Sequence, residues 1–117
     1  MNEIVNQAEL DEAVGNEAVT SYTHIFKNPI NYNNTEITIL TFDFDKLTGN
    51  DDLAIEKELN GMGIMYVSPE FNSEYLIRLC AKACTTPITY DFFSYCKMPD
   101  YKAIKAKARS FLLRAEL

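Results

Sequence analysis

The sequence predicts an α+β fold in which an N-terminal antiparallel β-hairpin packs on a cluster of three to four α-helices. Residues 22–44 alternate with the period of β-strands, whereas the apolar residues after position 50 recur at helical spacing. Strands followed by a run of helices are typical of a small antiparallel sheet against a helical layer. The 117 residues suit one domain, which we expect over residues 21–117. Residues 1–20 are acidic, and we expect them to form a flexible segment before this domain.

The hairpin is predicted from a strand that begins at Tyr22, a turn at Asn33-Asn34 and a second strand over residues 36–44. Asparagine favours this turn because it tolerates the left-handed conformation that tight hairpins require. Pro29 predicts that the first strand lies at the edge of the sheet or begins after this residue.

The second strand carries apolar side chains on both of its faces. One face must meet the helices, and the other is either covered or available to a partner. Alternation places Ile37, Ile39 and Thr41 on one face and Thr38, Leu40, Phe42 and Phe44 on the other.

The first helix is predicted to begin after Thr48, which can cap free amide groups, and to end at Gly61. Acidic residues in its first turn suit the positive end of the helix dipole. Its apolar stripe consists of Ile55, Leu59 and Met62. The short apolar segment 64–67 that follows is predicted to be either a third strand or a buried connector.

The next helix is predicted to start at Ser68-Pro69-Glu70 and to run to about Cys84, since proline is accepted in a first helical turn. A short amphipathic helix is predicted from Asp91, and the last helix opens at Asp100. One side of the last helix has the spacing of a core-facing stripe. Its members are Tyr101, Ile104, Ala108, Phe111, Leu112 and Ala115.

The formal net charge of −6 is divided unevenly along the chain. Residues 1–60 hold twelve acids and three bases, a charge of −9, whereas residues 61–117 hold five acids and eight bases, a charge of +3. Nucleic-acid binders carry a basic footprint, so we predict no nucleic-acid partner. An acidic half joined to a basic half fits protein partners, head-to-tail self-association or simple solubility. Because no apolar run approaches the ~20 residues of a membrane span, we also predict no membrane partner.

The sequence shows no constellation that carries chemistry. The three cysteines, Cys80, Cys84 and Cys96, are expected to be reduced thiols that pack as small hydrophobic side chains. A zinc site is the alternative, but Cys96 and the single histidine, His24, lack a recognised ligand spacing. A catalytic histidine needs a nucleophile that it can orient, and glycine motifs for phosphate are absent. We therefore predict no catalytic, cofactor-binding or metal-binding residues, and we expect that the protein is not an enzyme.

One surface of the last predicted helix is a candidate for partner binding. Lys102, Lys105, Arg109 and Leu113 follow one another at i, i+3, i+7 and i+11, which forms a basic stripe beside the core face. The stripe is either a solvated helix face or a docking strip for an acidic or amphipathic partner, including the acidic segment of this chain.

Two groups of short motifs carry a resemblance to a known family. The first group is Asn28-Pro29-Ile30-Asn31-Tyr32, Glu36-Ile37 and the run from Phe44 to Asp51. The second is Ser73-Glu74-Tyr75-Leu76, Leu79-Cys80-Ala81-Lys82-Ala83, Pro87-Ile88, Asp100-Tyr101 and Phe111-Leu112-Leu113. Over residues 28–114 the chain resembles the tail-assembly chaperones of long-tailed bacteriophages and prophages.

The resemblance implies a protein-binding assembly factor that acts in the cytoplasm of a bacterial host. Such proteins bind the tape-measure protein, keep its hydrophobic helices soluble and help to recruit tail-tube subunits, without remaining in the virion. This chain would be the shorter of two products of a translational frameshift. The alternative is a permanent structural or adaptor subunit of a phage or prophage assembly, in which the hairpin edge joins neighbours by strand addition.

Overall fold

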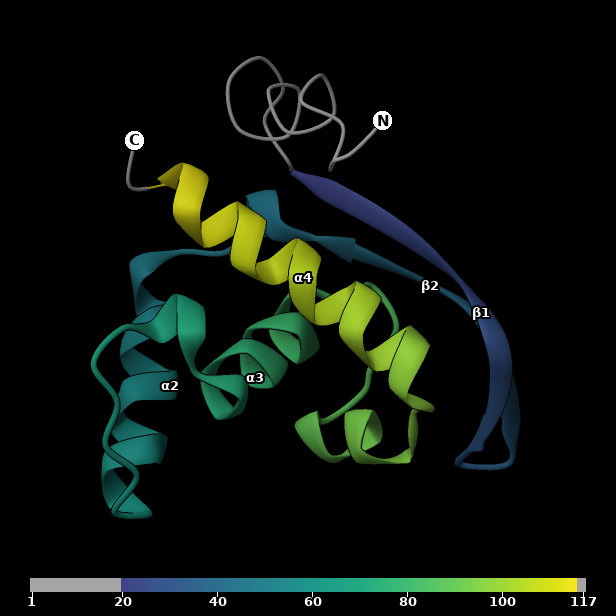
Figure 1. Ribbon diagram of the computed structural model, residues 1–117, viewed down its shortest axis with the longest axis horizontal. Helices are drawn as coiled ribbons and strands as arrows, with labels where there is room; N and C mark the ends of the chain where they lie inside the picture. Colours follow the sequence, from purple (N-terminus) through teal and green to yellow (C-terminus); the bar gives the residue numbers. More distant parts are fainter. Residues whose placement is uncertain (1–19, 116–117) are drawn as a thin grey trace.

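The computed structural model describes residues 20–115, within which an antiparallel hairpin packs against three α-helices (Figure 1). The predicted α+β class is confirmed. The flexible segment predicted for residues 1–20 lies outside the described residues, apart from Thr20. The elements are β1 (Ser21–Tyr32), β2 (Thr35–Asp43), η2 (Phe44–Lys46), α2 (Gly49–Gly61), η3 (Pro69–Phe71), α3 (Ser73–Ala83), η4 (Tyr90–Tyr95) and α4 (Met98–Ala115), where η denotes a 3-10 helix.

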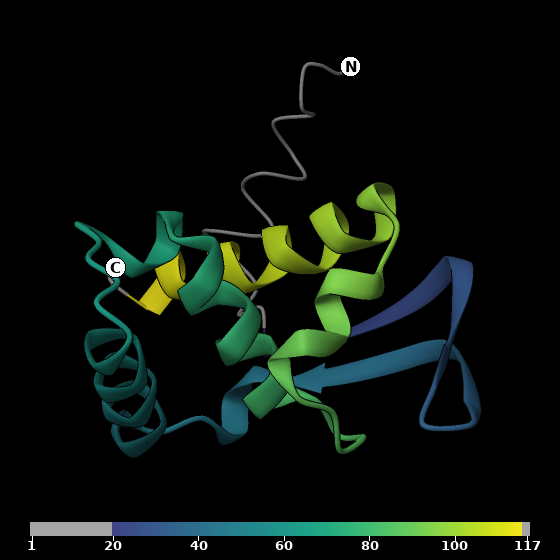
Figure 2. The same cartoon turned by 90° about the horizontal axis from the view of Figure 1, so that it is seen from below.

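Helix α3 is the central element of the helical layer, because both α2 and α4 pack against it. Helix α4 also contacts β1, and the hairpin curves away beyond the helices as an arm (Figures 1 and 2). The side chains between these elements form one hydrophobic core. Its most deeply buried members include Phe42 and Phe44 next to the sheet, Ile55 and Leu59 of α2, Leu76 and Ala83 of α3, Phe92 of η4, and Ile104 and Ala108 of α4.

The hairpin turn lies at Asn33 and Asn34 as predicted, and both residues have positive φ angles of 52° and 64°. Strand β1 runs through Pro29, so the prediction that it could begin after this proline is wrong and the edge-strand alternative is correct. The pairing changes register between Ile25, which is opposite Ile39, and Ile30, which is opposite Ile37.

This register change corrects the predicted faces of β2. Ile37 is buried, whereas Ile39 is 52% exposed, so the two do not share a face. The simple alternation of a strand is broken between them because an irregularity in pairing re-aims the side chains that follow it. Ile39 instead lies opposite Ile25 on the outer face of the hairpin, where Ile25 is 74% exposed.

A buried carboxylate of α4 holds β1 at the register change. Residues 26–29 have no paired partner on β2, and the backbone N–H groups of Lys27 and Asn28 donate instead to the Asp100 carboxylate at 3.0 and 3.1 Å. His24 Nε2 lies 2.8 Å from the same carboxylate, and its Nδ1 lies 2.7 Å from the Tyr22 hydroxyl. Asp100 is 1% exposed, so its charge is stabilised by these three bonds and not by bulk water.

The Asp100 carboxyl has a pKa below its ordinary value. Burial alone would raise this pKa, but the amide hydrogen bond from Lys27, the bond from His24 and the amide hydrogen bond from Asn28 together lower it by more. The folded protein therefore stabilises the ionised form of Asp100.

Local signals place the first helix correctly and the second only in part. Helix α2 follows Thr48, whose backbone N–H donates to the Asp51 carboxylate at 2.8 Å, which completes a capping box. Met62 lies beyond the end of α2 and is 53% exposed, so its predicted place in the apolar stripe is wrong. Residues 64–67 form a connector without helix or strand, so a third strand is wrong, and the predicted burial is wrong at Met65 and Val67, which are exposed.

The segment Ser68-Pro69-Glu70 does not begin the long helix that was predicted there. Residues 69–71 form the separate 3-10 turn η3, and α3 starts after Asn72, whose side chain accepts from the Tyr75 N–H at 2.8 Å. An Asn side chain competes for backbone donors and therefore ends one turn and caps the next. The sequence also predicts an apolar stripe on this helix at Tyr75 or Leu76, then Leu79, Cys80 and Ala83, and this stripe is confirmed because all of these residues are buried.

Asp100→Ala is expected to lower the free energy of unfolding by about 3 kcal/mol or more, because it removes a buried hydrogen-bonded charge and leaves two amides without acceptors. Asp45→Ala is a matched control, since Asp45 is exposed, and it is expected to change stability by less than about 0.5 kcal/mol. Urea unfolding followed by circular dichroism measures both. Equal effects of the two substitutions would contradict the role assigned to Asp100.

The stability that Asp100 supplies is expected to depend on acidity. An unfolded aspartate has a pKa of about 3.9, and folding lowers this pKa. The contribution is therefore complete above about pH 5, where the unfolded aspartate is ionised, and is lost as the pH falls through the folded pKa. The difference in unfolding free energy between the parent and Asp100→Asn should shrink between about pH 5 and pH 2. A difference that stays constant over this range would contradict the lowered pKa.

Candidate docking surface

Exposed apolar side chains gather at one end of the molecule. Six of the eleven large hydrophobic residues that are exposed within residues 20–115 belong to α2, to the loop after it, to η3 and to the last turns of α4. These segments lie together on the left of Figure 1. We call this surface the apolar end, and it consists of Leu53, Met62, Met65, Val67, Phe71 and Leu113.

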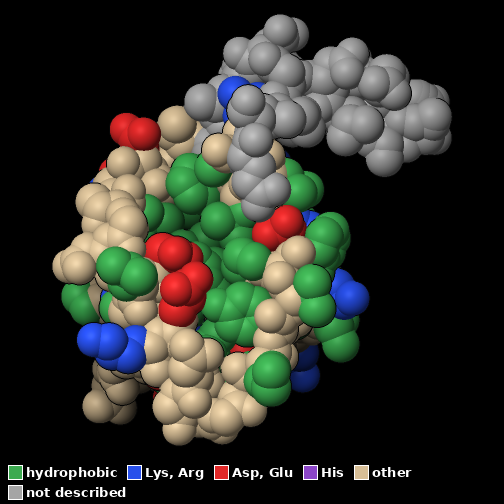
Figure 3. All heavy atoms as spheres, turned by 90° about the vertical axis from the view of Figure 1, so that its left-hand side faces the viewer, with side chains coloured by type: hydrophobic (Ala, Val, Ile, Leu, Met, Phe, Trp, Pro, Cys, Tyr) green, Lys and Arg blue, Asp and Glu red, His purple; other side chains and the backbone are tan. Residues whose placement is uncertain are grey.

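The apolar end exists because α2 and α4 use different parts of α3. Helix α2 buries Ile55 and Leu59, and α4 buries Ile104 and Ala108, which leaves other apolar side chains of both helices outside the core. Figure 3 shows hydrophobic side chains gathered in a hollow of this face, with acidic and basic groups around it. Phe111, predicted to face the core, is only half-buried and stacks on Phe44 at a ring-centroid distance of 5.2 Å.

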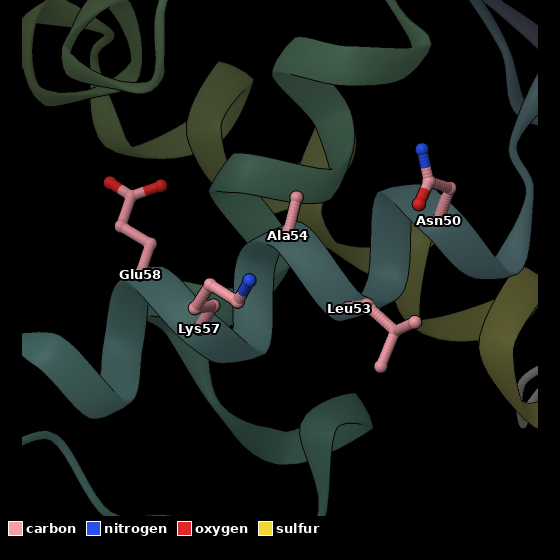
Figure 4. Close-up of a pocket in the computed structure, with 5 residues that line it drawn as sticks. All are labelled: Asn50, Leu53, Ala54, Lys57 and Glu58. Atoms are coloured by element: carbon pink, nitrogen blue, oxygen red, sulfur yellow. The ribbon is translucent and has the colours of Figure 1, made fainter.

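A cavity of about 630 Å³ lies along α2 (Figure 4). Leu53 and Ala54 supply its apolar lining, and Asn50, Lys57 and Glu58 supply polar groups. Leu53 is 61% exposed although it belongs to a helix that contributes two fully buried residues to the core. Sequence patterns alone do not single out Leu53. The one signal for it was a leucine outside the Ile55–Leu59 stripe, next to Asp51 and Asp52.

The buried Arg78 of α3 ties α2 to the helical layer and so fixes this cavity. Its Nε lies 3.0 Å from a Glu58 oxygen as an ion pair without an aligned hydrogen bond, and one terminal nitrogen donates to Glu74 at 2.7 Å. The guanidinium also stacks over the Tyr90 ring at 3.9 Å. Burial lowers the pKa of Arg78, but the carboxylates of Glu74 and Glu58 raise it by more, so the group stays charged.

The predicted docking strip is only partly open. Lys105 Nζ lies 2.9 Å from Ser73 Oγ, and Arg109 Nε donates to the Glu70 carbonyl oxygen at 2.9 Å. These two bases therefore join α4 to α3 and η3. Lys102 and Leu113 are exposed. The four residues do lie along one helix, and binding of a partner by them remains a prediction.

The side chains that could carry chemistry are held inside the fold. His24 is buried between Tyr22 and Asp100. Burial raises the pKa of Cys80 and Cys84, and it raises the pKa of the half-buried Cys96 to about 12. Residues 20–115 contain no group of three or more potential ligands that could hold a metal ion.

Comparison with known proteins adds no assignment: no protein family, no curated protein and no solved structure matches this chain. Within the part of the chain that the structure describes, no helix is both long and apolar enough to cross a membrane. The function is therefore argued from the surfaces of the molecule.

The three thiols are expected to react slowly with a disulfide reagent at about pH 8, because raised pKa values leave little thiolate. Cys96 should react first, since it is the only one of the three that is not fully buried, and Cys96→Ser should remove this first phase. In denaturant all three should react quickly. A native thiol that reacts as fast as a free cysteine would contradict this account and would make that cysteine a candidate for a chemical function.

Proposed function

We propose that this protein is a phage tail-assembly chaperone that binds the tape-measure protein through the apolar end. The observation that carries the proposal is the apolar end itself, where Val67, Met65 and Phe71 are 102%, 92% and 69% exposed. Soluble proteins seldom leave a contiguous apolar surface of this kind without a partner. The resemblance over residues 28–114 supports the choice of this partner. Recruitment of tail-tube subunits and a place in the bacterial cytoplasm are parts of the same proposal.

The expected free energy of binding suits a protein that binds its client reversibly. Full burial of one such side chain contributes about 1.5–3 kcal/mol. Association costs several kcal/mol in lost freedom, and the side chains at the interface must also be ordered. The surplus is modest, which allows release when the tail assembles. The net charge of −6 would keep the loaded complex soluble.

The shape of the apolar end favours a helical client. An amphipathic helix can lay its apolar face on an exposed apolar surface through residues at i, i+3, i+4 and i+7. The polar groups at the cavity of α2, among them Asn50, Lys57 and Glu58, could border such a helix and set its direction.

The alternative function, a permanent structural or adaptor subunit, is favoured by a different surface. Ile25 and Ile39 are cross-strand partners on the outer face of the hairpin and are 74% and 52% exposed. Thr23 and Thr41 continue this face, with their hydroxyl oxygens 3.0 Å apart. A neighbour could cover this face or add a strand to the hairpin edge.

Co-expression with a tape-measure fragment tests the chaperone proposal. Leu53→Ser combined with Val67→Ser should reduce recovery of the soluble fragment about tenfold, equivalent to a loss of about 1.4 kcal/mol of binding. Ile25→Ser combined with Ile39→Ser is the matched control, since it also replaces two exposed aliphatic side chains by serine, but on the hairpin. This control should leave recovery unchanged. Both double variants should melt within a few degrees of the parent, because the four side chains lie outside the core.

Loss of recovery in the hairpin variant alone would contradict the assignment to the apolar end. Purified phage particles separate the two functions, because a chaperone is absent from them and a structural subunit is present. Stoichiometric retention of this chain in particles would overturn the chaperone proposal.

A further inference from the structure

Helix α4 carries a one-sided charge. It contains five basic residues, and its only acid, Asp100, is buried and bonded to β1 and His24. The five bases are Lys102, Lys105, Lys107, Arg109 and Arg114. Nearly half of the eleven bases in the chain therefore lie on this single helix.

The bases form two rows with small residues between them. Lys105 and Arg109 lean toward Ser73 and η3, whereas Lys107 lies on the opposite flank, with its Nζ 5.2 Å from the centre of the Tyr22 ring. At 100° per residue, Ala106 and Ser110 fall between the two rows. The outer side of α4 therefore carries a strip of small side chains with basic residues along both of its sides, and we call this strip the track.

The chain enters the fold beside this track. The Thr20 carbonyl oxygen accepts from the Phe44 N–H at 2.8 Å, and Tyr22, two residues later, lies under Lys107. The nineteen residues before Thr20 contain no lysine or arginine and five acids. These acids are Glu3, Glu9, Asp11, Glu12 and Glu17.

We propose that residues 1–19 dock in cis along the outer side of α4. Their carboxylates would lie between the row of bases that begins at Lys102 and the row that begins at Lys107. At up to ~3.3 Å per residue the segment reaches the whole helix, and its attachment at Thr20 gives an effective concentration in the millimolar range. The exposed side of α2 offers no alternative, because Asp51, Asp52 and Glu56 would repel it. The inference does not depend on the proposed chaperone function, since it is argued from the charges of α4 and of residues 1–19.

The docked segment would act as an internal competitor for acidic ligands. Single surface ion pairs contribute little, but several pairs in one tethered segment add up and remain sensitive to salt.

Nuclear magnetic resonance of the full chain tests the docking. Neutralising the five acids with Gln and Asn should shift backbone resonances of residues 102–114 and leave those of α2 and η4 unchanged. Raising NaCl to about 0.5 M should reproduce the same shifts in the parent, because salt at this concentration strongly screens the attraction between exposed charges.

Reciprocal variants supply the control. Lys102→Gln combined with Lys107→Gln should shift the resonances of residues 1–19, whereas Lys57→Gln combined with Lys82→Gln, which removes the same charge from α2 and α3, should not. Resonances of residues 1–19 that are identical in the parent and in the Lys102/Lys107 variant would overturn the proposal.

Two rival occupants give different results. If a second copy supplies the segment, the shifts in α4 should depend on protein concentration, and this dependence would overturn docking in cis. If the face instead binds nucleic acid and is not covered by the segment, the parent should bind a single-stranded oligonucleotide at low salt, Lys102→Gln combined with Lys107→Gln should weaken that binding, and the resonances of residues 1–19 should be unchanged by the double substitution, which would overturn the proposal.

Discussion

The fold depends on one buried carboxylate that replaces missing strand pairs. Asp100, in the first turn of α4, accepts the N–H groups of Lys27 and Asn28 where the hairpin changes register, and it lies 2.8 Å from His24 Nε2. A two-stranded hairpin alone is marginal in water. Its attachment to α4 places that helix across β1, and the packing of α4 on α3 then completes the core. Both candidate interaction surfaces follow from this position of α4.

The two surfaces have different chemistry and different proposed uses. The apolar end offers hydrophobic side chains from α2, the loop after it and η3, which suits a helical client held by many modest contacts. The outer side of α4 offers positive charge along a track of small residues, which suits an acidic segment. Under the two proposals, a hydrophobic client and the chain's own acidic segment would occupy different surfaces. Binding and solubility are then supplied by separate parts of the molecule.

The features that can be predicted from this sequence are those that depend on interactions between residues close together in the chain. The Asn33-Asn34 turn, the capping of α2 after Thr48 and the buried stripe of α3 depend on neighbours within a few residues. The exposure of Ile39 could not be predicted, because it follows from a register change where Lys27 and Asn28 bond to a residue more than 70 positions away from them. The apolar end was missed for a similar reason, since only tertiary packing shows which apolar side chains of α2 and its loop remain outside the core. The basic strip was found, but its contacts with Ser73 and Glu70 are also tertiary.

Hydrogen–deuterium exchange of the purified complex with a tape-measure fragment tests the central claim most directly, because it reports where a client lies without altering either protein. The account predicts that binding slows exchange in α2, in residues 62–71 and in the last turns of α4, and leaves the amides of the hairpin unchanged. Slowed exchange confined to β1 and β2, with none in α2 or the loop that follows, would contradict the account and would favour a subunit that joins its neighbours through the hairpin.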